Sequence, residues 1–535
     1  MTARLKRGAI PLGLAVASLA LALAQRPGAA SSDTKIDLHV DPSSFLAAVS
    51  SPWTDAYGLG AVWSGQYSGY LWPMGPFFAL GHALGLAPWL VHRLWLGLML
   101  ALAAWGAVRL LDALHRPERG VAHLVAGAAV VLNPYTVVFA NRTSITLLAY
   151  ASLPWLLLCT HRGLRAPRGW WWPAAFALVL ASAGGGVNAA TTAWVLLAPV
   201  LLALYELWVT GLRWRAALGF GLRVAPLVLL SSAWWIVPTL VQAADGIDFL
   251  RFTEQPSVIW HTTSLAESLR GMGYWTAYTE LGFGGVKVPF FSDAGTLLFD
   301  PLVIVASLLR PALALLSFAA ARRHPYAPFL LGLTLVGAFV MMAGFPEGSP
   351  LRRAITTVYE HVDAVRFLRT TYKAGPLTMF GSALLLGLGA ERAWGRLRAG
   401  AVVLTLAVLV FASLPFFQGR AVDRDVEYSI PAAWTHAAAD VDRTLPAGTR
   451  TVVLPGSLFG FYDWGGVTDP AFPVLSDRPT AARFVVPYSD LRAIDLLWTV
   501  DGLVEDQRTL PGQLPPLLDL MGAGAVISPF DYDAR

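Results

Sequence analysis

Apolar residues occur along this chain in runs of about 20 residues, separated by short segments that hold most of the charge. A run of that length crosses the hydrocarbon core of a bilayer as an α-helix. After a first apolar run within residues 1–24, the pattern predicts spans near 89–112, 120–140, 143–160, 170–186, 187–209, 217–242, 298–320, 326–344, 375–393 and 398–417. We therefore predict an integral membrane protein with about eleven transmembrane helices.

The first apolar run has a basic flank and a core of about 15 residues, which is the length of a signal-peptide core. The cleavage sites that follow it are poor or weak, so the sequence favours a retained first span. The orientation follows from the arginines, because positive charge gathers in cytoplasmic loops. The basic loops on the side of the starting Met1 hold Arg116, Arg119, Arg162, Arg165, Arg168, Arg213, Arg215, Arg322, Arg323, Arg392, Arg396 and Arg398. We expect a multi-pass plasma-membrane protein with a cytoplasmic N-terminus and an extracytoplasmic C-terminal segment.

Composition agrees with a membrane protein. The chain of 535 residues is 56% hydrophobic and 14% charged, against about 25% charged residues in a typical soluble protein. The pI of about 9.3 does not indicate a nucleic-acid partner, because the positive charge lies in short loops rather than on one face. The single cysteine, Cys159, excludes an intramolecular disulfide and a cysteine-based zinc cluster.

The same orientation places four larger segments outside the membrane: the first loop at 31–78, the loops at 243–297 and 345–374, and the tail from 418. The tail has short β-branched runs at 449–455 and 523–528 and a predicted helix at 492–507. Strands that alternate with helices are typical of an α/β domain. We predict a partial, incomplete α/β segment over 418–535, after a membrane domain over 1–417.

The first loop carries two acidic residues that deserve separate interpretations. Asp41 precedes Pro42 and a short apolar run, as the N-cap of a helix does. Its capping and catalytic roles are equally open. Asp37 has no capping role in the pattern, and a carboxylate beside the membrane could act as a general base on a sugar hydroxyl. An ordinary hydrated loop remains the alternative.

Aromatic and cationic residues add further candidates for binding. The aromatic residues of the first loop could stack on sugars or form a belt at the membrane interface: Trp53, Trp63, Tyr67, Tyr70 and Trp72. Arg366, Arg369 and Lys373 lie on the outer side, where the orientation rule disfavours positive charge. They could hold the phosphate of a specific lipid or of ordinary anionic phospholipid. Arg270, after a predicted helix, is a weaker candidate for the same role.

The chain lacks the sequence motifs of several common enzyme classes. The chain contains no Walker A loop, G-x-S-x-G elbow, H-E-x-x-H or paired C-x-x-C. These absences argue against the usual nucleotide-driven enzymes and zinc hydrolases. No ligand cluster requires a metal, although a divalent ion at Asp37 remains possible. The predicted spans are almost free of charge, which favours an enzyme above the bilayer over a transporter with polar residues at mid-depth.

Taken in order, motifs over most of the chain resemble the N-terminal membrane region of the actinobacterial α-(1→3)-arabinofuranosyltransferase family. They are Lys35-Ile-Asp-Leu, Asp41-Pro-x-x-Phe-Leu, Gly69-Tyr-Leu-Trp-Pro-Met-Gly-Pro-Phe-Phe, Pro88-Trp-Leu-Val-His-Arg-Leu-Trp, Asn133-Pro-Tyr, Ser152-Leu-Pro-Trp, Gly185-Gly-Val-Asn-Ala-Ala, Ala233-Trp-Trp-Ile-Val-Pro, Ser268-Leu-Arg-Gly, Val486-Pro-Tyr-Ser-Asp-Leu-Arg and Pro511-Gly-Gln-Leu.

The resemblance implies an all-α integral membrane GT-C glycosyltransferase fold whose first outer loop supplies the catalytic acid, Asp37 or, as the alternative, Asp41. It implies a polyprenyl-phosphate-linked arabinofuranose donor and a cell-wall arabinan acceptor, in arabinogalactan or lipoarabinomannan. We expect inverting α-(1→3) transfer, with the donor phosphate held by Arg270, Arg366 and Lys373. The expected sugar contacts are Gln66, Tyr70 and Trp53. The alternatives are a polyprenyl-phosphomannose-dependent transferase, a transporter or flippase for a lipid-linked sugar, and a non-catalytic scaffold.

Overall fold

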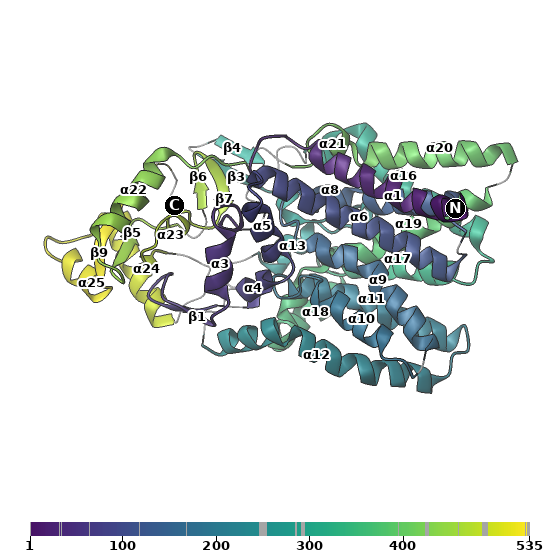
Figure 1. Ribbon diagram of the computed structural model, residues 1–535, viewed down its shortest axis with the longest axis horizontal. Coiled ribbons are helices and arrows are strands. Elements are labelled where there is room, and N and C mark those ends of the chain that lie inside the picture. The colour runs from purple at the N-terminus through teal and green to yellow at the C-terminus, as the bar shows by residue number, and fades with distance from the viewer. Residues whose placement is uncertain are drawn as a thin grey trace.

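The chain forms a bundle of long helices, a layer of short elements at one end of it, and a smaller tail of strands and helices beyond that layer (Figure 1). The N-terminus lies at the end of the bundle that is far from the tail. The structure is a computed structural model, and the residues that it describes are 2–31, 33, 35–63, 65–116, 118–166, 168–245, 254–283, 286–289, 295–393, 395–422, 427–457, 460–483, 491–529 and 531.

Every predicted span contains a helix. The bundle consists of α1 (Thr2–Leu23), α6 (Pro88–Leu114), α7 (Val121–Val131), α8 (Pro134–Asn141), α9 (Thr146–Arg165), α10 (Trp171–Ala181), α11 (Ala189–Trp208), α12 (Trp214–Asp245), α16 (Pro301–Ala321), α17 (Ala327–Met342), α19 (Gly375–Arg392) and α20 (Gly395–Ala412). Within the described residues, five helices are long and apolar enough to cross a membrane, and four shorter helices are also apolar. The number of spans therefore stays a prediction.

Two of the expected spans differ in detail. The span expected at 120–140 is interrupted between α7 and α8, where Leu132 and Asn133 leave the helix. The span expected at 170–186 ends as a helix at Ala181, and hydrogen-bonded turns carry the chain through the glycines to α11. The first difference lies at Asn133, whose side chain caps α8, and the second lies beside glycines, which have a low helix propensity. Hydropathy measures neither capping nor helix propensity.

Helices in the bundle differ in what surrounds them. Almost every residue of α19 is buried, whereas α12 exposes large apolar side chains such as Leu229 at 63% and Leu230 at 75%. An apolar helix with an exposed apolar surface is stable only in an apolar solvent, because exposed hydrocarbon in water is unfavourable. The bundle therefore has a central helix inside protein and outer helices suited to contact lipid.

A buried arginine ties two of these helices together. Arg310 lies near the middle of α16 and is fully buried, a position where a charge is costly unless it is paired or hydrogen-bonded. Its Nη1 donates to the Ser382 hydroxyl and its Nη2 to the Met379 carbonyl oxygen, both at 2.9 Å. Both partners belong to α19, so Arg310 links two helices of the bundle. This structural role explains the buried charge without a transport path.

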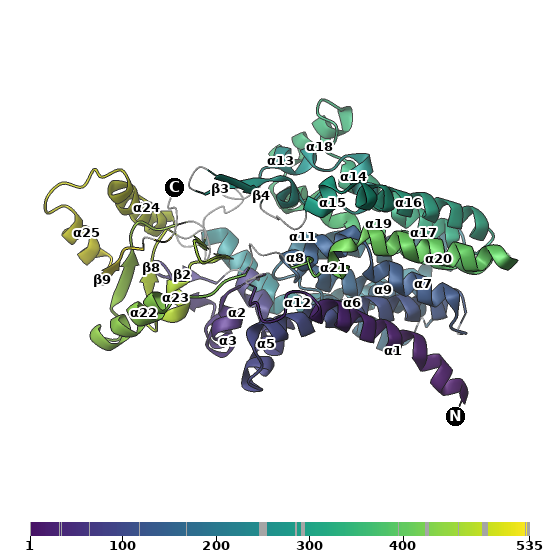
Figure 2. The ribbon, with the colours of Figure 1, turned by 90° about the horizontal axis from the view of Figure 1, so that it is seen from above.

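The layer between bundle and tail holds the loops that were predicted to lie outside the membrane (Figure 2). Its first part contains α2 (Asp37–Val40), α3 (Pro42–Val49), β1 (Trp53–Thr54), β2 (Ala61–Val62), α4 (Gly65–Ser68), η1 (Gly69–Leu71) and α5 (Met74–Ala83). Its other parts contain α13 (Pro256–His261), α14 (Leu265–Arg270), η3 (Trp275–Tyr278), β3 (Glu280–Phe283), β4 (Val286–Pro289), α15 (Gly295–Phe299), α18 (Pro350–His361), η4 (Asp363–Arg369), η5 (Thr371–Ala374) and α21 (Leu414–Phe417).

The tail contains a three-stranded parallel sheet in the order β8-β5-β9. Its elements are α22 (Ala432–Thr444), β5 (Arg450–Val453), β6 (Gly460–Tyr462), β7 (Gly465–Thr468), α23 (Phe472–Leu475), β8 (Thr480–Ala481), α24 (Leu491–Glu505), α25 (Leu514–Leu520) and β9 (Ala523–Ile527). The first loop joins this unit: Ile36 is buried in the tail's core, and the Thr480 amide donates to the Ala56 carbonyl oxygen at 2.9 Å. First loop and tail therefore form one packed body.

Close contact between α17 and α19 depends on glycine. A Cβ atom added at Gly337 would lie 2.6 Å from the backbone nitrogen of Thr378, and small residues allow such backbone approach in membrane bundles. We expect Gly337→Ala to lower the stability of the protein by about 1–3 kcal/mol, the usual cost of overpacking. Thermal unfolding in detergent measures this effect. Gly332→Ala on the same helix is the control, because a Cβ atom there has no neighbour within 4 Å, and an equal loss in both variants would contradict the packing argument.

Candidate active site

Asp37 opens α2 in the first loop, and its side chain is 6% exposed. The Tyr57 hydroxyl donates a hydrogen bond to its Oδ1 at 3.1 Å. Burial and the nearby negative charge of Asp469 raise the pKa of Asp37, the positive charge of Lys35 opposes both, and the net result is a pKa of about 6. A carboxylate with this pKa is largely ionised at neutral pH and still accepts protons well, as a general base must.

Asp469 comes from the tail, directly after β7, and completes this cluster. Lys35 donates to Asp469 Oδ1 at 2.8 Å, and its ammonium group lies 4.4 Å from the centre of the Tyr67 ring. Burial raises the pKa of Asp469. Its Oδ2 atom is buried and has no hydrogen-bond partner among the described residues. An unsatisfied buried carboxylate oxygen is costly unless water or a ligand contacts it.

Asp41 has the geometry of a helix cap. Its Oδ1 accepts hydrogen bonds from the backbone amides of Ser43 at 3.2 Å and Ser44 at 3.0 Å, and Pro42 occupies the first position of α3. Hydrogen bonds from Ser44 hold the pKa of Asp41 below its usual value. Of the two roles that the sequence left open, the structure provides the contacts for capping.

Asp33 is another acid of the first loop, and the sequence analysis did not single it out. Both its carboxylate oxygens are engaged: the Ser144 amide donates to Oδ1 at 2.7 Å, the Ser144 hydroxyl donates to Oδ2, and His92 Nε2 lies 3.2 Å from Oδ2. Burial alone would raise the pKa of Asp33, but the contacts with His92 and Ser144 lower it on balance. The sequence feature that could have identified Asp33 is its position as the first acid after the first predicted span.

Three aromatic rings form a stack in the layer of short elements. The rings of Phe139 and Tyr274 are stacked at 4.9 Å, and those of Tyr274 and Tyr372 at 5.2 Å. At the far end, the Lys373 ammonium lies 5.6 Å from the Tyr372 ring centre. Burial lowers the pKa of Lys373 to about 8, Glu254 opposes this shift and Arg369 adds to it. The half-buried Lys373 thus lies at one end of this aromatic layer.

The three cations predicted to bind phosphate do not meet. Arg270 donates to the Ser307 hydroxyl at 2.7 Å and also contacts Glu267 and the Leu297 carbonyl oxygen, so its guanidinium is used inside the protein. Arg366 donates to the Tyr359 carbonyl oxygen at 3.1 Å and pairs with Asp363 at 2.8 Å, in a pocket beside α18. Lys373 lies in the aromatic layer.

The predicted sugar contacts also separate. Trp53 is 56% exposed on β1, at the outer edge of the first loop. Tyr70 is 1% exposed and packs against Phe45, so in this conformation it belongs to the core rather than to an open surface. Gln66 lies in α4, and its side chain is outside the described residues. The exposed ring that remains available for stacking is Trp53.

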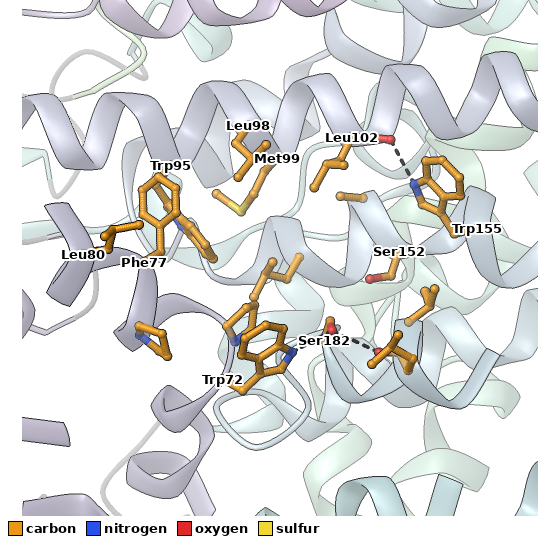
Figure 3. Close-up of a pocket in the computed structure, with 16 residues that line it drawn as sticks. Trp72, Phe77, Leu80, Trp95, Leu98, Met99, Leu102, Ser152, Trp155 and Ser182 are labelled. Carbon is orange, nitrogen blue, oxygen red and sulfur yellow. Dashed lines mark hydrogen bonds between the residues drawn. The ribbon is translucent and has the colours of Figure 1, made fainter. Parts of the chain in front are cut away.

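Figure 3 shows a groove of about 570 Å³ that α5, α6, α9 and α10 form below the first loop. Trp72 closes it by donating from Nε1 to the Ser182 hydroxyl at 2.8 Å. The groove is lined by apolar side chains and two serines and holds no charged group, so it offers a surface for hydrocarbon rather than for catalysis.

Among the described residues, no group of three or more His, Cys, Asp or Glu side chains is arranged to hold a metal ion.

The cap contacts of Asp41 generate a prediction. Asp41→Ala removes the acceptor for two amides and should lower the free energy of unfolding by about 0.5–2 kcal/mol. Asp41→Asn keeps an acceptor oxygen and should cost little. Thermal unfolding of both variants measures this difference. Equal stability of the alanine variant and the unaltered protein would refute the capping role.

Comparison with known proteins identifies the family of this chain. The family model described as alpha-(1->3)-arabinofuranosyltransferase, N-terminal GT-C domain, matches residues 17–535. The alpha-(1->3)-arabinofuranosyltransferase of Mycobacterium tuberculosis is 30% identical over 569 residues, which cover 99% of this chain and 38% of that protein. The Mycolicibacterium smegmatis enzyme of the same name is 28% identical over 545 residues, which cover 97% of this chain and 37% of that protein.

The cryo-EM structure of the mycobacterial arabinofuranosyltransferase AftD has a TM-score of 0.74 to this chain at 25% identity, and the match covers 98% of this chain and 35% of that one. This chain therefore spans little more than a third of the length of these relatives. The predicted family is confirmed, and so is the multi-pass membrane character that the apolar helices indicate. The chain belongs to the α-(1→3)-arabinofuranosyltransferase family of GT-C membrane glycosyltransferases, whose N-terminal GT-C domain it matches.

Proposed function

We propose that this chain transfers arabinofuranose from a polyprenyl-phosphate donor to a cell-wall arabinan, with inversion and an α-(1→3) linkage, on the outer side of the plasma membrane. The observation that carries the proposal is the buried carboxylate of Asp37, placed by the first loop against Lys35 and the tail's Asp469. The names of the relatives support the sugar and the linkage.

In this mechanism Asp37 removes the proton from the acceptor hydroxyl. The acceptor oxygen then attacks the anomeric carbon from the face opposite the phosphate, and the bond between that carbon and the phosphate oxygen breaks. The polyprenyl phosphate leaves with the electron pair of that bond. Lys373 stabilises the negative charge that develops on it, whereas Arg366 lies in a separate pocket beside α18. Arg270 is a weaker candidate, since its guanidinium already has three partners inside the protein.

Asp33 has a supporting role in this proposal. Its oxygens already accept bonds from Ser144 and face His92, which leaves less capacity for an acceptor hydroxyl than Asp37 has. It would hold the start of the first loop against the bundle. A divalent ion would find carboxylate ligands in Asp37 and Asp469, since carboxylates suit hard cations, and no step of the mechanism depends on one.

The proposed topology has the N-terminus in the cytoplasm and both the first loop and the tail outside. The arrangement supports it, because the N-terminus lies at the opposite end of the bundle from the tail (Figure 1). The arginine-rich loops fall on the side of the N-terminus, as cytoplasmic loops do. A site at the outer end would meet a lipid-linked donor at the membrane surface.

Replacement of the proposed base tests the mechanism. Asp37→Asn keeps the shape of the side chain but removes its basicity, so the rate of transfer should fall about 10²- to 10⁴-fold. The assay incubates membranes that hold the protein with labelled polyprenyl-phosphoryl arabinose and a short arabinan. Asp41→Asn is the matched control and should keep its activity. Full transfer by a folded Asp37→Asn variant would remove Asp37 from the mechanism, and loss only in Asp33→Asn would assign the base to Asp33.

The pKa of Asp37 gives a second test. A base with a pKa of about 6 is ionised roughly ten times more at pH 7 than at pH 5, so the rate of transfer should rise about tenfold over that range. Asp469→Asn removes a negative charge that raises the pKa of Asp37, so the midpoint of the acid side should move to lower pH. A pH–rate profile of both proteins measures the shift. An unchanged midpoint would show that the two carboxylates are not coupled.

A further inference from the structure

A pocket of about 410 Å³ lies in the tail, and we refer to it as the tail pocket. It is formed by the start of α22, by the turn between β6 and β7, and by the residues that follow β9. Figure 1 shows α22, β6 and β7 in this part of the molecule, beyond the end of the bundle. Neither Asp37 nor Asp469 lines the tail pocket, so it is separate from the candidate active site. Its volume falls within the range of sites for small ligands.

Two tryptophans of the tail pocket are held in place by one carboxylate. Both indole nitrogens donate to Asp531 Oδ2, from Trp434 at 2.6 Å and from Trp464 at 2.9 Å. The Trp464 ring also stacks on the Tyr462 ring, with ring centres 4.4 Å apart and planes that differ by 6°. The Trp434 and Trp464 rings meet at 68°. They therefore form a preorganised aromatic corner, and a ligand that binds there does not have to order the rings.

Trp464 occupies a position where the fold does not require an aromatic ring. Asp463 and Trp464 are the two residues between Tyr462 and Gly465, which pair across the hairpin of β6 and β7. Such short turns favour Gly, Asn and Asp. Trp464 is half-buried and lines the tail pocket. A large ring of this kind in a tight turn is typical of a binding surface, because loops on a packed scaffold present the residues that contact ligands.

The charged side chains that line the tail pocket accept hydrogen bonds. Asp463 is exposed at the turn. Asp531 Oδ1 is buried and has no hydrogen-bond partner within the described part of the chain, which is costly unless a ligand or water donates to it. Both indole N–H groups already donate to Asp531 Oδ2. Because two carboxylates repel an anion, the lining favours a neutral ligand that is rich in hydroxyl donors.

A sugar matches both the rings and the carboxylates. The face of an aromatic ring is negative, so it attracts the C–H groups of a sugar ring, which carry a partial positive charge. Sugar hydroxyls donate to carboxylate oxygens in charge-assisted hydrogen bonds. The tail pocket offers two aromatic rings beside two carboxylates, and therefore has the chemistry of a carbohydrate site.

We propose that the tail pocket binds a segment of the arabinan acceptor away from the end that reacts, and this inference rests on the function proposed above. The rings of Trp434 and Trp464 contact the sugar faces, and Asp463 and Asp531 accept hydrogen bonds from the hydroxyls. The tail pocket is coupled to the first loop, because Ile36, the neighbour of Asp37, is buried in the same core as Trp434. A polymer held at the tail pocket would raise the effective concentration of its reactive end at the active site.

Two alanines of α22 provide a matched test. Ala433 is exposed and lines the tail pocket, whereas Ala439 is exposed on the same helix and does not line it. Ala433→Leu fills part of the cavity without removing a ring or a carboxylate, and Ala439→Leu adds the same side chain elsewhere. The full chain in phosphatidylcholine nanodiscs is titrated with a fluorescent linear hexa-arabinofuranoside. We expect Ala433→Leu to weaken binding at least about fivefold and Ala439→Leu to leave it within about twofold.

Asp463→Asn is the second variant, because Asp463 is exposed at a turn that also favours asparagine. It should weaken binding several-fold with an unchanged unfolding temperature. Equal binding by the Ala433→Leu variant, the Ala439→Leu variant and the unaltered chain would overturn the assignment. Competition by maltohexaose, a chain of pyranose sugars, as strong as that by the unlabelled hexa-arabinofuranoside would overturn arabinan as the ligand. Equal competition by hexalysine would overturn a sugar ligand in favour of a cationic peptide.

Failure of the proposed function remains distinguishable, because the binding assay contains no donor. Binding that Ala433→Leu weakens, in a chain without transferase activity, would leave the tail pocket standing and refute the transfer. In a chain with transferase activity, Ala433→Leu should raise the KM for the hexasaccharide by a factor similar to the loss of binding. A fall in kcat with an unchanged KM would overturn the role of the tail pocket in binding the acceptor.

Discussion

A break in a helix inside an apolar bundle exposes backbone groups where no water can satisfy them, and the rest of this structure depends on how one such break is stabilised. At the end of α7, the Asn133 side chain donates to the Val130 carbonyl oxygen at 2.8 Å and accepts from the Thr136 amide at 3.1 Å. The Tyr150 hydroxyl also donates to the Val130 carbonyl oxygen, at 2.7 Å. With these bonds made, the chain can leave the helix and restart it as α8.

The restart at Pro134 determines where the next loop lies. Helix α8 ends at Asn141, and Ser144 then donates two hydrogen bonds to Asp33, which fixes the beginning of the first loop against the bundle. From there Ile36 enters the tail's core, and Asp37 is buried beside it. The break thus positions the acid of the candidate site through a short series of contacts, although it makes no contact with that acid.

The tail contributes to this site as much as the first loop does. Asp469, far along the chain, raises the pKa of Asp37 and forms an ion pair with Lys35. In water the charges of Asp469, Asp37 and Lys35 would interact weakly. Burial strengthens both the ion pair and the shift in pKa. A division of the chain at residue 417, which hydropathy predicts, therefore separates two parts whose side chains meet in one cluster.

The sequence predicted that each apolar span contains a helix, because such runs satisfy a bilayer and their own backbone locally. It offered the Asp41 cap as one of two roles, because the partners of the cap lie within three residues. The composition of the candidate site follows from the tertiary structure. It brought Asp469 and Asp33 into the site, placed Tyr70 in the core, engaged Arg270 inside the protein and separated Arg366 from Lys373. Burial and charge act between residues that are distant in the chain, so their effects follow from packing and cannot be deduced from spacing.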